Sequence, residues 1–81
     1  MDDKQILHRI TELVDEEHGL RSRAQTGQID SDEERTRLRE LEVALDQCWD
    51  LLRQRRARRE VGEDPGEAQL RPAGEVEGYL Q

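Results

Sequence analysis

The chain has few aromatic and few apolar residues. Among its 81 residues there is one tryptophan, one tyrosine and no phenylalanine, and leucine, isoleucine and valine together number 17. This apolar fraction lies just above the composition at which a chain stops being able to bury a core of its own. A catalytic pocket needs walls several layers thick, and a chain this small and polar has little apolar surface from which to build them. We therefore expect at most one domain and no enzyme.

Cysteine and long apolar runs are also scarce. Cys48 is the single cysteine, which excludes an intrachain disulfide and a cysteine-based zinc site. Its apolar neighbours, with no basic residue within a turn, favour packing over redox chemistry. No apolar run exceeds two residues before the first break, and the N-terminus is acidic where a signal peptide would be basic. These absences predict a cytoplasmic protein without a membrane segment.

Charge, by contrast, is abundant. Charged residues make up 41% of the chain, and the formal net charge is -7. Residues 61–81 hold five acids and one arginine, so most of the excess lies in the last quarter. Net acidity disfavours general binding to nucleic acid or to anionic membranes.

Apolar residues spaced by three and four predict a first helix over about residues 3–25. They are Ile6, Leu7, Ile10, Leu13, Val14, Leu20 and Ala24. On a helical wheel they fall within one arc of about 140°, as expected for an amphipathic helix with one buried face. Glu17 interrupts this arc, and we expect it to reach the edge of the seam and pair with Arg21 one turn later.

A break and a new start follow at residues 26–31. Gly27 is suited to the left-handed residue that ends a helix. Ser31 followed by Glu34 has the spacing of a capping box. From there an apolar seam recurs at alternating steps of three and four, through Leu38, Leu41, Leu45, Cys48 and Leu52. We expect this second helix to cover about residues 32–60 and to stop before Gly62 and Pro65.

The short connection between two amphipathic helices predicts an all-α, antiparallel two-helix hairpin over residues 1–61. Residues whose numbers sum to about 58 should then face each other. This rule places Asp2 and Asp3 beside Arg55 and Arg56. Residues 62–81 show no sustained period and much turn chemistry, so we expect an irregular or disordered acidic tail.

A lone hairpin of this composition is short of buried surface. Some apolar side chains lie off the main seam, where one partner helix does not cover them. We expect them to mediate self-association of two hairpins into a four-helix bundle, a homodimer. They are Leu7, Val14, Ala44, Trp49 and Leu51. For Trp49, at the edge of the seam, a place in the core is the other interpretation.

An arginine cluster closes the second helix. It consists of Arg53, Arg55, Arg56, Arg58 and Arg59. These positive charges complement the helix dipole, and we expect acids of the same chain to form ion pairs with most of them. Two functional hypotheses remain: binding to the acidic surface of a partner protein, or a nucleic-acid-associated regulator. The second is disfavoured because the arginines point around the whole helix and no aromatic residue lies among them.

The end of the tail carries a second candidate for partner binding. Tyr79 and Leu80 form an apolar pair at the end of an otherwise polar segment. Three alternatives are open: the pair folds back onto the hairpin, extends into solvent without a role, or serves as a short linear motif for another protein.

The sequence offers no catalytic residues and implies no cofactor. It contains no phosphate-binding glycine-rich loop, no nucleophile elbow and no His-Glu-x-x-His motif. His8, Glu12, Asp15 and His18 share the outer face of the first helix, but a di-iron bundle directs such residues inward. A metal-binding bundle is therefore a distant third hypothesis, and we expect no metal site.

As a whole, the chain resembles a short actinobacterial family of unknown function. The resemblance rests on four segments: Leu13-Val14-Asp15-Glu16-Glu17-His18, the run from Leu41-Glu42 through Leu45 to Arg56, Gly62-Glu63-Asp64-Pro65, and Val76-Glu77-Gly78-Tyr79-Leu80-Gln81. It covers nearly the whole chain. The resemblance implies no activity, cofactor or catalytic residue.

Overall fold

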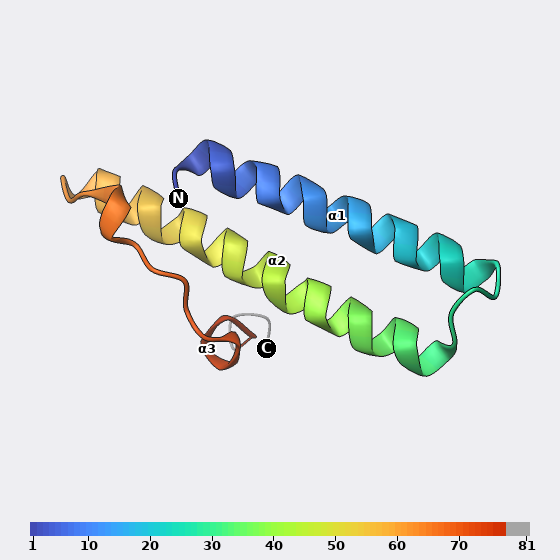
Figure 1. Cartoon of the computed structure of the whole chain (residues 1–81). Helices are drawn as coiled ribbons and strands as arrows, with labels where there is room; N and C mark the ends of the chain where they lie inside the picture. Colours follow the sequence, from blue (N-terminus) through green and yellow to red (C-terminus); the bar gives the residue numbers. More distant parts are fainter. Residues whose placement is uncertain (78–81) are drawn as a thin grey trace.

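In the computed structural model the chain is an antiparallel helical hairpin, with its C-terminal segment folded back along one helix (Figure 1). The structure describes residues 1–77. Its elements are α1 (Asp3–Gln25), α2 (Ser31–Glu60), the short 3-10 helix η1 (Pro65–Glu67) and α3 (Ala73–Glu77). The described residues contain no strand. The all-α hairpin predicted from the sequence is confirmed.

Aspartates begin both long helices. Asp2 accepts a hydrogen bond from the backbone N–H of Gln5, whose side chain accepts one from the backbone N–H of Asp2, and the two bonds form a capping box. At α2 the cap is Asp30, which accepts from the backbone N–H of Glu33 at 2.8 Å. The expectation that Ser31 is the cap is wrong by one residue, because Asp30 has the extended backbone of a cap and Ser31 is already helical.

Glycines end both helices in the same way. Gly27 and Gly62 adopt positive φ values of 76° and 78°. After α1, the backbone N–H of Gln28 donates to the carbonyl of Arg23; after α2, that of Glu63 donates to the carbonyl of Arg58. These bonds span five residues and are those of the Schellman motif, which a left-handed glycine permits. The predicted role of Gly27 is confirmed.

The core lies along the seam between α1 and α2. Its buried members are Ile6, Ile10, Leu13, Leu20, Leu41, Cys48 and Leu51. Glu17 interrupts the seam and pairs with Arg21 at 3.7 Å, as predicted. Because the core is a single row between two helices, its burial depends on both helices being in place.

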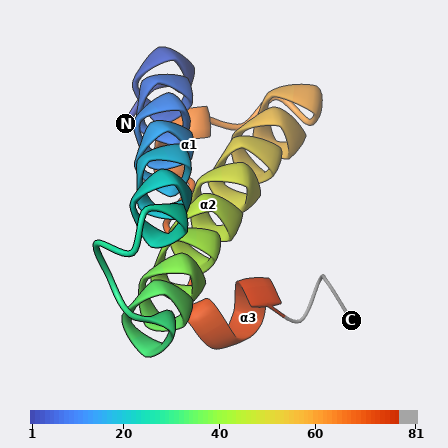
Figure 2. The same cartoon turned by 90° about the vertical axis from the view of Figure 1, so that its right-hand side faces the viewer.

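Residues 63–77, called the strap from here on, run back along α2 (Figure 1). The strap was expected to be irregular or disordered; it is irregular at residues 68–72, with η1 before and α3 after. Val76 in α3 is buried, with 1% of its surface exposed, and Ala68 packs against the core. Figure 2 shows α3 lying beside the middle of α2, far from the hairpin's open end. The strap therefore adds a third segment to the two-helix core.

Candidate functional site

One face of α2 carries polar side chains that bind the strap. Gln47, Asp50, Gln54 and Arg58 recur at steps of three and four, which places them on one side of the helix. The amide of Gln47 donates to the backbone carbonyl of Arg71 at 3.1 Å. These four residues are called the polar ladder below.

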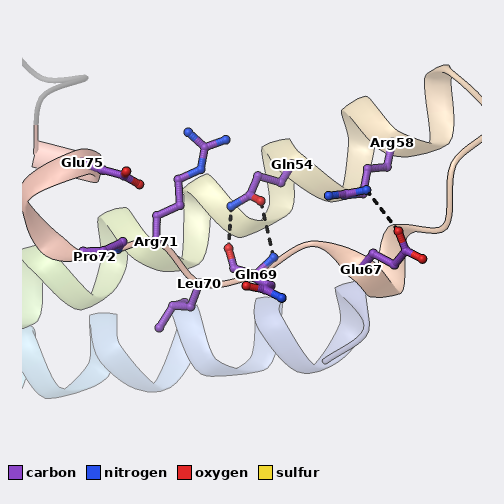
Figure 3. A pocket seen from close by; sticks show the side chains of 8 residues that line it. All are labelled: Gln54, Arg58, Glu67, Gln69, Leu70, Arg71, Pro72 and Glu75. Carbon is purple, nitrogen blue, oxygen red and sulfur yellow. Dashed lines mark hydrogen bonds and ion pairs between the residues drawn. The ribbon is translucent and has the colours of Figure 1, made fainter.

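Gln54 makes the most complete contact with the strap backbone. Its Nε2 donates to the carbonyl of Gln69 at 2.7 Å, and its Oε1 accepts from the backbone N–H of Gln69 at 3.4 Å (Figure 3). Nearby, Arg55 donates to the carbonyl of Pro65 at 3.2 Å. These bonds recognise the peptide backbone and do not depend on the strap's side chains.

Charged contacts fix the register of the strap. Asp50 is almost fully buried at 2% exposure, and its Oδ2 accepts a 2.9 Å bond from Gln54 and forms an ion pair with Arg71 Nε at 3.4 Å. About two turns further along α2, Arg58 pairs with Glu67 at 3.5 Å. The ladder thus offers a negative site for an arginine and, beyond it, a positive site for an acid.

An open groove of about 590 Å³ lies between the strap and the polar ladder. It is lined by Gln54, Arg58, Glu67, Gln69, Leu70, Arg71, Pro72 and Glu75 (Figure 3). The lining is mostly polar and mixes both charges. Sequence reasoning missed this site, although three polar residues at helical spacing, Gln47, Asp50 and Gln54, were the signal that pointed to it.

Acids of the same chain occupy most of the predicted arginine cluster. Arg55 and Arg59 both bind Asp3, the latter at 2.8 Å, and Arg58 pairs with Glu63 at 3.0 Å. The expected proximity of Asp3 to Arg55 is therefore confirmed. Arg53 is exposed, and it too has an interaction within the protein.

Asp2 and Arg56, which were also predicted to lie beside each other's helix, have other partners. Asp2 caps α1 and its contact there is with Gln5, whereas Arg56 pairs with Glu60 on its own helix at 3.2 Å. Arg56 remains 79% exposed.

The carboxylate of Asp3 responds to this environment. Hydrogen bonds from Arg59, and then from Arg55, hold the pKa of Asp3 below its ordinary value of 3.8. Asp3 is consequently the residue that ties the start of α1 to the end of α2.

An apolar face lies on the other side of the hairpin from the strap. Trp49 is 45% exposed and Leu7 is 48% exposed. At 100° per residue, Trp49 points about 160° away from Gln47 and about 140° away from Gln54. The handedness of two antiparallel helices places Leu7 and Val14 on the same side as Trp49. The apolar face thus comprises Leu7, Val14, Leu38, Leu45, Trp49 and Leu52.

Two of the residues predicted for self-association are at least half covered, and a third is misplaced. Val14 and Ala44 are partly buried against the core. Leu51 is 7% exposed and belongs to the core, so its assignment to an outer surface is wrong. It lies about 60° in helical phase from both Cys48 and Gln54, between the side of α2 that meets α1 and the side that meets the strap.

Cys48, His8 and Glu12 are further candidates from the sequence. Cys48 is buried, and its burial raises the pKa of the thiol, which Arg9 only partly offsets. His8 and Glu12 lie 3.5 Å apart on the exposed face of α1. Within residues 1–77, no group of three or more potential metal ligands is positioned to hold an ion. Tyr79 and Leu80 lie outside the described residues.

Among residues 1–77, no helix has the length and apolar character needed to span a membrane.

Fold and site together define a class: a small helical hairpin whose C-terminal strap is held by side chains of its second helix. The chain belongs to the family described as "Protein of unknown function (DUF2630)", which it matches over residues 2–81. It is 54% identical over 77 residues to an uncharacterized protein of Mycobacterium bovis and to one of Mycobacterium tuberculosis, covering 95% of this chain and 88% of each relative. The expected resemblance is confirmed. No solved structure matches the chain.

Proposed function

We propose that this protein is a non-enzymatic interaction protein that self-associates through the apolar face into a four-helix bundle. The observation that carries the proposal is the half-exposed pair of Leu7 and Trp49 on the side of the hairpin that the strap leaves open. Tryptophan is the side chain most often found at the energetic centre of a protein interface, because it removes a large apolar area from water.

The shape of the protein supports a second copy as the partner. The structure measures 51 × 25 × 15 Å, and its radius of gyration is 15.1 Å, against about 12 Å for a globular chain of this length. The least of these dimensions, 15 Å, shows that the molecule is flat. Stable domains pack two layers around a core, and a second hairpin on the apolar face supplies the second layer.

The charge pattern of α2 favours the same partner. Its first turn holds Asp32, Glu33 and Glu34, and its last turns hold the arginine cluster. A copy related by a two-fold axis across the helix brings the acidic end of one α2 to the arginine-rich end of the other. Arg56 and Glu34 are suited to this pairing, because they lie about 20° and about 60° in helical phase from Trp49, and the Arg56 side chain is 79% exposed.

A further partner protein forms the second part of the proposal. Arg56, at the open end of the hairpin, offers an exposed positive charge to an acidic surface. Tyr79 and Leu80 remain the predicted linear motif. A nucleic-acid-associated role is less favoured, because Arg55, Arg58 and Arg59 are each paired with acids of the chain itself.

The test is to place a charge on the apolar face and measure molecular mass by light scattering after size exclusion. We expect Trp49→Glu to convert a dimer into a monomer while the helix content by circular dichroism stays unchanged. Leu70→Glu is the matched control, because Leu70 is also exposed, at 57%, but lies on the strap. The proposal fails if the wild-type chain is monomeric at tens of micromolar, or if Trp49→Glu leaves the dimer intact.

A further inference from the structure

The strap is bound to α2 as an extended peptide is bound by a receptor. Gln47 and Gln54 of the polar ladder, together with neighbouring Arg55, donate to strap backbone carbonyls, and Gln54 also accepts from a strap N–H. Backbone recognition of this kind accepts many sequences, as it does where a peptide is bound along a protein groove.

Two charged contacts and one apolar contact add sequence specificity. Arg58 takes an acid at Glu67, Asp50 takes a base at Arg71, and Val76 is buried at 1% exposure. The acid therefore precedes the base by four residues, and an apolar residue follows the base by five. Asp50 sets the preference for a basic residue at this position, since a carboxylate this deeply buried requires a cationic or hydrogen-bonding partner.

Some of the strap's contacts are open to solvent. In the ion pair of Arg58 with Glu67, both side chains are partly exposed, at 31% and 70%. Leu70 of the strap is 57% exposed. A left-handed glycine, Gly62, joins the strap to α2 and permits a change of chain direction there. A competing segment that makes the same contacts therefore has a route to displace it.

We propose that the polar ladder of α2 is a peptide-docking groove, which the strap occupies in the free protein and an extended segment of a partner protein occupies in the complex. The chemistry of that segment is an acidic residue, an arginine or lysine four positions later, and a small apolar residue five positions after that. The strap thereby acts as an internal competitor that sets the affinity for the partner.

The probe for this groove is a fluorescent synthetic peptide with the sequence of residues 63–77. It is titrated by anisotropy into the full-length chain and into full-length Val76→Asp, in which the internal strap is loosened. We expect the peptide to bind Val76→Asp at least tenfold more tightly than the wild-type chain. A peptide with alanine in place of the arginine is expected to lose at least tenfold in affinity.

A second variant keeps the test decisive if Val76→Asp loses helix content. Glu67→Ala combined with Arg71→Ala loosens the strap without placing a charge in the core, and it is titrated in the same way. Adding Gln54→Ala to either variant should weaken binding at least tenfold, because it removes two of the four hydrogen bonds to the peptide backbone. The proposal is overturned if the peptide binds neither loosened chain, or if a scrambled peptide binds equally well.

Exchange of straps between two copies is a distinct outcome. In that case the Trp49→Glu chain would still form a dimer, and the peptide would dissociate it. This result would overturn the proposal that a partner protein's segment occupies the groove. Peptide binding to a monomeric Trp49→Glu chain with loosened strap supports the proposal. The groove and the apolar face lie on different sides of α2, so failure of self-association leaves the groove result interpretable.

Discussion

Asp3 of α1 and Arg55 of α2 form an ion pair across the open end of the hairpin, and Arg59 binds the same carboxylate. The Arg55 side chain is only 12% exposed, because the strap covers it and accepts a bond from it through the carbonyl of Pro65. One guanidinium therefore links the first helix, the second helix and the strap. The stability of this end should depend on the charge of Asp3.

Replacing Asp3 by asparagine should destabilise the hairpin at neutral pH, and the difference from wild type should vanish in acid. Bonds from Arg59 and Arg55 hold the pKa of Asp3 below 3.8, so the stabilisation is fully present above that value. It is lost as the pH falls through the lowered pKa of the folded state. Thermal unfolding of both proteins between pH 7 and pH 2 measures this difference.

The control for that series is Asp15→Asn, which makes the same charge change at an exposed position on α1. It should leave the melting temperature nearly unchanged throughout. A constant difference between wild type and Asp3→Asn down to pH 2 would show that the ionised carboxylate is not what stabilises this end.

Breaking the pair of Asp50 and Arg71 should destabilise the protein by about 1–3 kcal/mol, since Arg71→Ala leaves a buried carboxylate with one bond fewer. Asp50→Ala should cost a similar amount. Because both substitutions remove the same contact, the loss of unfolding free energy in the double variant should be smaller than the sum of the losses in the two single variants. Urea unfolding of the four proteins provides the cycle, and strict additivity would contradict a direct coupling.

Truncating Val76 to alanine should destabilise the docked strap by about 1–2 kcal/mol, the value for removing two buried carbon atoms. The effect should appear as faster amide exchange in residues 64–76, with a smaller change along α1. Leu70→Ala, on the same strap but exposed, is expected to change stability by less than about 0.5 kcal/mol. Equal effects of the two substitutions would mean that α3 is not docked in solution.

Cys48 should react slowly with a thiol reagent in the native protein and rapidly in urea. Burial both blocks access and raises the thiol pKa, which lowers the fraction of reactive thiolate. By the same linkage, the stability contributed by the neutral thiol is lost as the pH rises above its ordinary value of 9.0. Equal labelling rates at pH 8 with and without denaturant would contradict the buried position.

The helical hairpin follows from local signals that are strong in this sequence. Apolar spacing locates α1 and α2, glycine locates their ends, and the short connection fixes the antiparallel register that brings Asp3 to Arg55. Each of these signals acts within one helix or one turn, so a single sequence is enough to read them.

The strap did not follow from such signals, because its docking depends on contacts between residues 9 to 24 positions apart. Gln47, Asp50 and Gln54 look like an ordinary solvated helix face, and Val76 is a single apolar residue without a period. The misplacement of Leu51 has the same origin. With only α1 as a packing partner, the side of α2 that carries Leu51 would be open, whereas the strap makes that side part of the core.

Self-association through the apolar face is the central claim, and sedimentation equilibrium of the wild-type chain from sub-micromolar to tens of micromolar tests it most directly. The chain has a mass of 9.5 kDa. The account predicts a reversible rise in apparent mass to twice that value as concentration increases. A folded monomer of single-chain mass at every concentration would contradict it.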